Sequence, residues 1–323
     1  MMKAAAINKY GTIDEIEIQE IPIPELRAND LLIEVHATSI NPVDIAIRKG
    51  WLAGRFPNTF PLVLGWDVSG IVIATGHLVT NFKVGDEVYS YSDLSRNGAT
   101  AEYIAVDENL VARKPKNLSF QEAASVPLVG ICSWRALINL GNIQRGQRVL
   151  ILGGSGGVGS FAIQLAKFMG AYVVCTTSTK NVPFVKRLGS DEVVDYTITG
   201  MENLNLQYDL VFDTVGREAL DKTYHLVKAN GKIVTISSFI DDEVLKIARD
   251  NHFYVISLTS EPSGEILSEI TNLLENMAIK PQVEKVIALD EIQMGHELIE
   301  SKHSRGKIVL QVKEDSNVRL QKE

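Results

Sequence analysis

The spacing of apolar positions changes character along the chain, near Ser119. Before about Val111, apolar residues form short β-rich pieces such as 31–35 and 70–73, separated by turn signals that include Asn41-Pro42. These pieces predict an antiparallel, partly closed β domain.

After Ser119 the chain reads as alternating helices and strands. Residues 120–140 have a helical pattern, and from Arg148 onward apolar strands alternate with amphipathic helices. The expected strands are 149–152, 172–176, 192–195, 209–213, 232–237 and 253–258. This alternation predicts an α/β domain with a doubly wound parallel sheet.

A shorter tail follows Pro262-Ser263-Gly264. We expect it to contain a helix to about Met277, a short strand near Val286, a helix from Glu291 and a last strand over 307–312. The tail is too small to fold alone, so it should pack back on one of the two domains. The predicted division of the chain is 1–121, 122–261 and 262–323.

Composition narrows the class of protein. The 323 residues exceed what one hydrophobic core usually organises, and 45% hydrophobic content suffices for two. The net charge is −8 and no basic block occurs, which argues against nucleic acid as a partner. No segment has the pattern of a signal peptide or of a membrane span. The two cysteines, Cys132 and Cys175, are expected to be small buried side chains of a reduced, cytoplasmic protein.

A glycine-rich turn is the strongest chemical signal. The expected strand 149–152 runs into Gly153-Gly154-Ser155-Gly156-Gly157-Val158-Gly159, and a helical run over 160–169 follows. Gly154, Gly156 and Gly159 satisfy the G-x-G-x-x-G pattern: the first permits a tight turn, the second lets a pyrophosphate approach and the third packs helix on strand. A purely structural turn is the alternative. The strand before it and the helix after it favour a dinucleotide site, and hence a Rossmann domain.

The choice of dinucleotide is made about 20 residues further on, where an NAD enzyme carries an acid for the ribose 2′-hydroxyl. The segment 175–180 ends instead in Ser178-Thr179-Lys180 and contains no carboxylate. The hydroxyl of Ser178 and the ammonium of Lys180 can hold a 2′-phosphate, unless Lys180 only marks an exposed helix start. We therefore expect NADPH.

Several further motifs accompany this turn: Asn41-Pro42-Val43-Asp44, 61–70, 84–88, 98–103, 193–196, 213–216 and 306–310. Together they resemble the medium-chain dehydrogenase/reductase superfamily nearly from end to end. Within it, the chain is similar to the quinone oxidoreductase branch of the zeta-crystallin type and to its enone and alkenal reductase relatives. The resemblance implies a GroES-like β domain formed by both chain ends, a central Rossmann domain and a homodimer.

The chain departs from the zinc alcohol dehydrogenases of that superfamily. It has Asn41 where those enzymes place the first ligand cysteine, and Gly65-Trp66-Asp67 where they place Gly-His-Glu. A catalytic zinc needs about three cysteine, histidine or carboxylate ligands, and none of the 6 histidines is spaced as a metal pair. We expect no metal.

The resemblance also suggests roles for single residues. It implies that Asn41 and Asp44 lie near the nicotinamide, with Asn41 the better donor to a developing oxyanion, although the same residues are typical of a turn. Tyr196 would lie beside the adenosine phosphate, and Val215 and Gly216 beside the nicotinamide. The other expected cofactor-binding residues are Cys132, Thr177 and Ser237.

The residues that would contact the substrate are less clearly defined by the sequence. Trp51, Trp66 and Tyr91, together with Trp134, would give a planar substrate a flat apolar lining, the alternative for each being core packing. No general acid stands out; solvent or a tyrosine such as Tyr91 would supply the proton. Lys302 and Arg305 either add charge near the phosphates or form a solvated helix end.

These observations predict a zinc-independent oxidoreductase that transfers hydride from NADPH to a quinone or an α,β-unsaturated carbonyl compound. One alternative is a protein that binds NADPH as a sensor or structural element with little turnover. The other is a zinc-type alcohol dehydrogenase, which the missing ligands disfavour.

Overall fold

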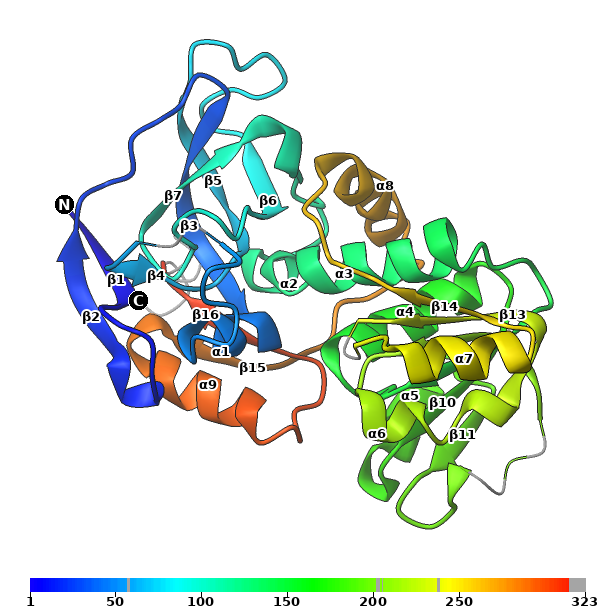
Figure 1. Cartoon of the computed structure of the whole chain (residues 1–323). Coiled ribbons are helices and arrows are strands. Elements are labelled where there is room, and N and C mark those ends of the chain that lie inside the picture. The colour runs from blue at the N-terminus through cyan, green and yellow to red at the C-terminus, as the bar shows by residue number, and fades with distance from the viewer. Residues whose placement is uncertain (57–58, 202–203, 205, 237–238, 314–323) are drawn as a thin grey trace. The chain divides into compact units, whose positions relative to one another are not determined.

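The computed structural model describes residues 1–56, 59–201, 204, 206–236 and 239–313, which form two compact units. Unit 1 comprises Met1–Leu128, Pro262–Glu275 and Val283–Glu323, and unit 2 comprises Val129–Glu261 and Asn276–Gln282. Figure 1 shows both with their labelled elements. The first boundary lies later than the predicted 121, because helix α2 (Phe120–Ala124) packs on strands of unit 1.

Unit 1 is built mainly from antiparallel strands. A sheet with the order β15-β16-β3-β5-β6-β8, with β7 paired to β3, lies beside a smaller sheet with the order β2-β1-β4. The strands are β1 (Met2–Ile7), β2 (Ile16–Ile21), β3 (Asp30–Ile40), β4 (Leu62–Val63), β5 (Asp67–Thr75), β6 (Glu87–Tyr91), β7 (Tyr103–Asp107), β8 (Val111–Arg113), β15 (Val283–Ala288) and β16 (Lys307–Gln311). The helices are η1 (Ile13–Glu15), α1 (Pro42–Arg48), η2 (Glu108–Leu110), α2, α8 (Gly264–Glu275), η7 (Leu289–Glu291) and α9 (Ile292–Glu300).

Both chain ends enter this unit. β16 pairs antiparallel with β3, so that Ile308 faces Ile40 and Gln311 faces Ala37. β3 pairs with β5 over its length, and Gly70 permits the approach because a Cβ there would lie 2.0 Å from the Glu34 carbonyl oxygen. The unit is therefore a GroES-like β domain made from sequence-distant segments.

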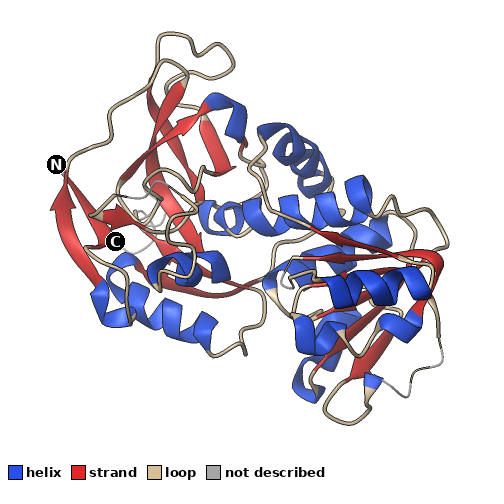
Figure 2. Ribbon diagram, in the orientation of Figure 1, coloured by secondary structure: helices blue, strands red, loops and turns tan. Residues whose placement is uncertain are grey.

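Unit 2 has a parallel sheet with the order β11-β10-β9-β12-β13-β14, the doubly wound arrangement that the sequence predicts. Its strands are β9 (Arg148–Leu152), β10 (Tyr172–Thr177), β11 (Glu192–Asp195), β12 (Tyr208–Asp213), β13 (Val227–Thr235) and β14 (Tyr254–Ser257). Its helices are η3 (Arg135–Leu140), α4 (Gly157–Phe168), η4 (Thr179–Asn181), α5 (Val182–Arg187), α6 (Arg217–Leu220), η6 (Tyr224–Leu226) and α7 (Asp242–Asp250). Figure 2 shows helices against both faces of this sheet.

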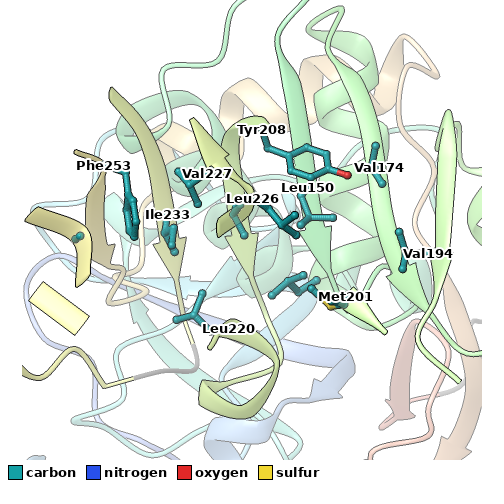
Figure 3. Close-up of a cluster of buried hydrophobic side chains, with 13 residues drawn as sticks. Leu150, Val174, Val194, Met201, Tyr208, Leu220, Leu226, Val227, Ile233 and Phe253 are labelled. Carbon is teal, nitrogen blue, oxygen red and sulfur yellow. The ribbon is translucent and has the colours of Figure 1, made fainter. Parts of the chain in front are cut away.

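The strands of unit 2 are apolar because their side chains form a buried core. A cluster of buried side chains crosses the strands from Val194 through Val174, Leu150 and Ile233 to Phe253 (Figure 3). Residues 149–152 of β9 are buried without exception, because a central parallel strand is covered on both faces.

The helical stretch predicted over 120–140 is divided. α2 ends before Val126, α3 (Pro127–Trp134) begins at Pro127, and η3 continues as a π-helix. The division follows from Pro127, which disfavours helical geometry in the residue before it. None of the described helices has the length and apolar character needed to cross a bilayer.

Candidate functional site

The glycine-rich turn joins β9 to α4 in unit 2. Gly153 adopts φ +78°, a left-handed conformation that favours glycine, and so it makes the sharp turn after β9. Gly154 is required for another reason, since a Cβ there would lie 2.8 Å from Cys175 Sγ. Likewise, a Cβ on Gly159 would lie 2.1 Å from the Gly153 carbonyl oxygen. Both glycines allow α4 to pack closely on the strands.

Gly156 differs from its neighbours because space is open beside it. A Cβ there would meet only the Gly153 carbonyl oxygen, at 3.5 Å. Gly156 is also the N-terminal cap of α4, whose first backbone N–H groups have no partner within the helix. Open space beside unpaired N–H groups at the positive end of a 12-residue helix fits a pyrophosphate. Gly157, Val158 and Gly159 supply these groups.

Side chains at the end of β10 reach back to this turn. Thr177 donates its hydroxyl hydrogen to Ser155 Oγ at 3.0 Å, and Asn181 Nδ2 donates to the same oxygen at 3.2 Å. Ser178 is half-buried, whereas Lys180 is exposed on η4 and its ammonium makes no hydrogen bond or ion pair with the described residues. Ser155, Thr177, Ser178 and Lys180 were expected here from the sequence. Asn181 was not, although an amide three positions after Ser178 was a usable signal.

The end of β11 lies next to these residues. Tyr196 donates its backbone N–H to the Thr177 carbonyl at 3.2 Å, and its side chain is 55% exposed. Hydrogen bonding from the Thr179 side chain, and then from the hydroxyl and N–H of Thr197, holds the pKa of the Asp195 carboxyl below its usual range. The carboxyl end of β10 therefore has a lysine with no partner among the described residues and, one strand away, an ionised acid.

The loop after β12 is fixed by a buried aspartate. Asp213 Oδ1 accepts from the backbone N–H groups of Val215, at 2.9 Å, and Gly216, at 3.0 Å. Val215 is 56% exposed, and a Cβ on Gly153 would lie 2.9 Å from its Cγ2. The loop thus lies against the glycine-rich turn. Cys132 is buried in α3, and Ser237 lies outside the described residues.

Unit 1 contains a buried polar cluster around Asn41. Its amide Nδ2 donates to Asp67 Oδ2 at 2.8 Å, and its Oδ1 accepts from the ammonium of Lys307. The same ammonium donates to the Ile40 carbonyl at 3.0 Å and to Asp67 Oδ2 at 3.4 Å, and Ser39 donates its hydroxyl to Asp67 at 2.8 Å. The sequence analysis missed Lys307 and Asp67 as partners, because only the pairing of β16, β3 and β5 brings them together.

Asp44 supports the turn that carries Asn41. Its Oδ2 accepts the Asn41 backbone N–H at 2.7 Å, while its buried Oδ1 has no hydrogen-bond partner among the described residues. Burial raises the pKa of Asp44 to about 7, against the effects of the Asn41 N–H and the Lys307 charge. Asp44 is therefore poised to change protonation near neutral pH.

The aromatic residues expected to line a substrate pocket differ in their exposure to solvent. Trp66 is fully buried and donates its indole N–H to the Arg96 carbonyl at 3.0 Å, and Tyr91 is buried on β6. These placements favour the core alternative for both. Trp51 is 72% exposed, with the Lys49 ammonium 5.2 Å from its ring centroid, and Trp134 is half-buried.

Two further expectations concern metals and basic residues. Within the described ranges, no group of three histidine, cysteine or acidic side chains could hold a metal ion. Lys302 and Arg305 are exposed in unit 1, and Arg305 donates its backbone N–H to Glu284 at 2.6 Å.

Comparisons with known proteins assign the family. The alcohol dehydrogenase GroES-like domain family matches residues 27–116, and the zinc-binding dehydrogenase family matches residues 188–310. The chain is 35% identical to NAD(P)H oxidoreductase RTN4IP1, mitochondrial, of Danio rerio, over 98% of this chain and 92% of the relative. It is 34% identical to 2-methylene-furan-3-one reductase of Solanum lycopersicum, over 96% of this chain and 79% of the relative.

A solved structure agrees with these sequence relatives. The quinone oxidoreductase from Coxiella burnetii superposes with a TM-score of 0.91 at 33% identity, covering 97% of this chain and 99% of that one. The second family is described as zinc-binding, but the described residues of this chain contain no group of three side chains that could hold a metal ion. With both family domains matched and relatives similar over nearly its whole length, the chain belongs to the medium-chain dehydrogenase/reductase superfamily.

Proposed function

We propose that this protein is a zinc-independent NADPH-dependent oxidoreductase that reduces a quinone or an α,β-unsaturated carbonyl compound. The observation that carries the proposal is the end of β10, where Ser178 and the exposed Lys180 stand in place of the acid that selects NADH. Similarity to relatives named as a quinone oxidoreductase and a methylene-furanone reductase supports the substrate class.

Unit 2 is the proposed cofactor-binding unit. The N–H groups of 157–159 would bind the pyrophosphate beside the open space at Gly156, and Ser178 and Lys180 would bind the 2′-phosphate. Val215 and Gly216 would contact the nicotinamide, and Tyr196 the adenosine phosphate. When bound, the nicotinamide supplies the hydride.

Unit 1 is proposed to supply the polar group for the substrate oxygen. Lys307 and Asp67 hold the two ends of the Asn41 carboxamide, and the second Nδ2 hydrogen has no partner among the described residues. We assign that hydrogen to the oxygen on which negative charge develops during reduction, where a preorganised donor is most effective. Asp44 fixes the turn and hence the direction of Asn41.

The direct test is oxidation of NADPH and of NADH by the purified protein with quinones, enones, alkenals and simple aldehydes, together with elemental analysis. We expect turnover with quinones or enones, a preference for NADPH and no stoichiometric zinc. One tightly bound zinc per chain, or turnover restricted to simple aldehydes and alcohols, would refute the proposal. Stoichiometric NADPH binding without turnover on any acceptor would support a sensor instead.

We also expect a homodimer and a cytoplasmic location. β14 is the last strand in the sheet order of unit 2, and Tyr254 on it is exposed, so a second copy is the expected partner for that edge. Light scattering measures the assembly, and microscopy of the tagged chain measures the location; a monomer or an organellar signal would refute the respective expectation.

A further inference from the structure

The hydroxyl of Ser155 has an unusual position in its hydrogen-bond network. Its Oγ accepts from two donors, the hydroxyl of Thr177 at 3.0 Å and the Nδ2 of Asn181 at 3.2 Å. A hydroxyl oxygen has two acceptor lone pairs and one hydrogen. Because both lone pairs are engaged, Ser155 can contribute only its hydrogen to a further partner, which must then be an acceptor.

Asn181, one of the two donors to Ser155, is itself buried and held by its backbone. It is 7% exposed, and its backbone N–H donates to the Ser178 carbonyl at 2.9 Å within η4. Its Nδ2 also lies 3.5 Å from Ser178 Oγ, so one amide group faces the oxygens of both serines. An amide nitrogen only donates, and it therefore turns both hydroxyl hydrogens away from itself.

The residues of this network lie where the sheet is expected to bind the adenosine ribose. Thr177, Ser178 and Asn181 all lie at the carboxyl end of β10, the position at which this sheet type binds the adenosine ribose. A 2′-phosphate offers only acceptor oxygens to neutral hydroxyls, whereas a 2′-hydroxyl both donates and accepts. A site in which Ser155 can only donate, and in which Asn181 turns the hydroxyl hydrogen of Ser178 away from itself, suits the phosphate.

We propose that Asn181 is a positioning residue that determines dinucleotide preference, by holding the hydroxyls of Ser155 and Ser178 as donors toward the 2′-phosphate. This inference rests on the proposed function, because it assumes that NADPH binds at the end of β10. It assigns to Asn181 an action through the two serines, distinct from the charge that Lys180 contributes.

The substitution Asn181→Asp makes the sharpest test. A carboxylate is nearly the same size, but it accepts hydrogen bonds from Ser155 and Ser178 and turns their hydrogens inward, while adding a negative charge. Asn181→Ala removes the amide without reversing the polarity. Asn251→Asp is the matched control, since Asn251 is an exposed amide at the end of α7 in the same unit.

Dissociation constants for NADPH and NADH are measured by fluorescence titration for each variant, with thermal unfolding as the test of folding. Asn181→Asp should weaken NADPH binding about 30-fold, the usual cost of losing hydrogen bonds to a charged group, while NADH changes less than about threefold. Asn181→Ala should weaken NADPH about tenfold, and the control should change neither constant.

A variant cycle tests whether Asn181 acts through the two serines. Asn181→Ala added to the Ser155→Ala, Ser178→Ala double variant should bind NADPH no more weakly than that double variant alone. Additive losses, or an equal weakening of both dinucleotides in the Asp variant, would overturn the inference. Failure of the unsubstituted protein to prefer NADPH would refute the proposed function instead, so the two failures are distinguishable.

Discussion

Lys307 on β16 places its ammonium 3.4 Å from the Asp67 carboxylate on β5, although 240 positions separate the two residues. Both are buried, and Asn41 hydrogen-bonds to both. The pair therefore joins the late and early segments of unit 1 at the residue to which we assign the substrate oxygen.

Replacing Lys307 by Met should destabilise the protein strongly. The change leaves the Asp67 carboxylate buried without its counter-ion, a loss of about 3–5 kcal/mol for buried pairs. Urea unfolding measures the effect. Asp67→Asn combined with Lys307→Met should recover part of it, because no buried charge then remains; a double variant less stable than Lys307→Met would contradict the explanation.

Two glycines of the turn should respond differently to alanine. Gly156→Ala should fold with a free energy of unfolding within about 1 kcal/mol of the parent, since its Cβ meets one atom at 3.5 Å, yet it should lose most NADPH binding. Gly159→Ala should lower stability by at least about 2 kcal/mol, because its Cβ would overlap the Gly153 carbonyl. Calorimetry and titration separate the two effects. The reverse order of stabilities would show that the turn is misassigned.

Lys180→Ala should raise the dissociation constant for NADPH by about tenfold or more and leave that for NADH nearly unchanged. The ammonium is exposed and has no partner in the described part of the chain, so removing it disturbs no other contact. Lys246→Ala, an exposed lysine of α7 paired with Asp250, serves as the control. Equal effects of Lys180→Ala on both dinucleotides would place the 2′-phosphate elsewhere.

Asp44 should make stability fall as the pH rises. Its pKa is raised from 3.8 to about 7, so between these values the folded chain retains a proton that the unfolded chain has released. The free energy of unfolding therefore decreases across that range, and Asp44→Asn removes the decrease. Relative to the parent, the variant should gain about 3 kcal/mol between pH 5 and pH 8. Urea unfolding at both pH values is the measurement, and parallel pH curves for the two proteins would exclude the effect.

Local patterns in the sequence were sufficient to predict much of the secondary structure of unit 2. The strand before Gly153 and the helix after Gly159 are encoded within about a dozen neighbouring residues, and the missing acid after β10 can be read directly. The alternation of strands and helices also predicted a doubly wound parallel sheet, which the structure confirms. Which of the adjacent glycines takes a positive φ could not be predicted from this local pattern; in the folded chain it is Gly153, at +78°.

Tertiary structure alone decided how distant residues meet. No pattern in the sequence links Lys307 to Asp67 and Asn41, since their contact depends on the register of β16 with β3 and of β3 with β5. Trp66 and Tyr91 are of residue types that often line pockets, yet both are buried in the folded chain. Short-range periodicity fixes which segments form strands and helices, but hydrogen-bond direction and burial depend on neighbours that only the folded chain provides, as Asn181 and Ser155 illustrate.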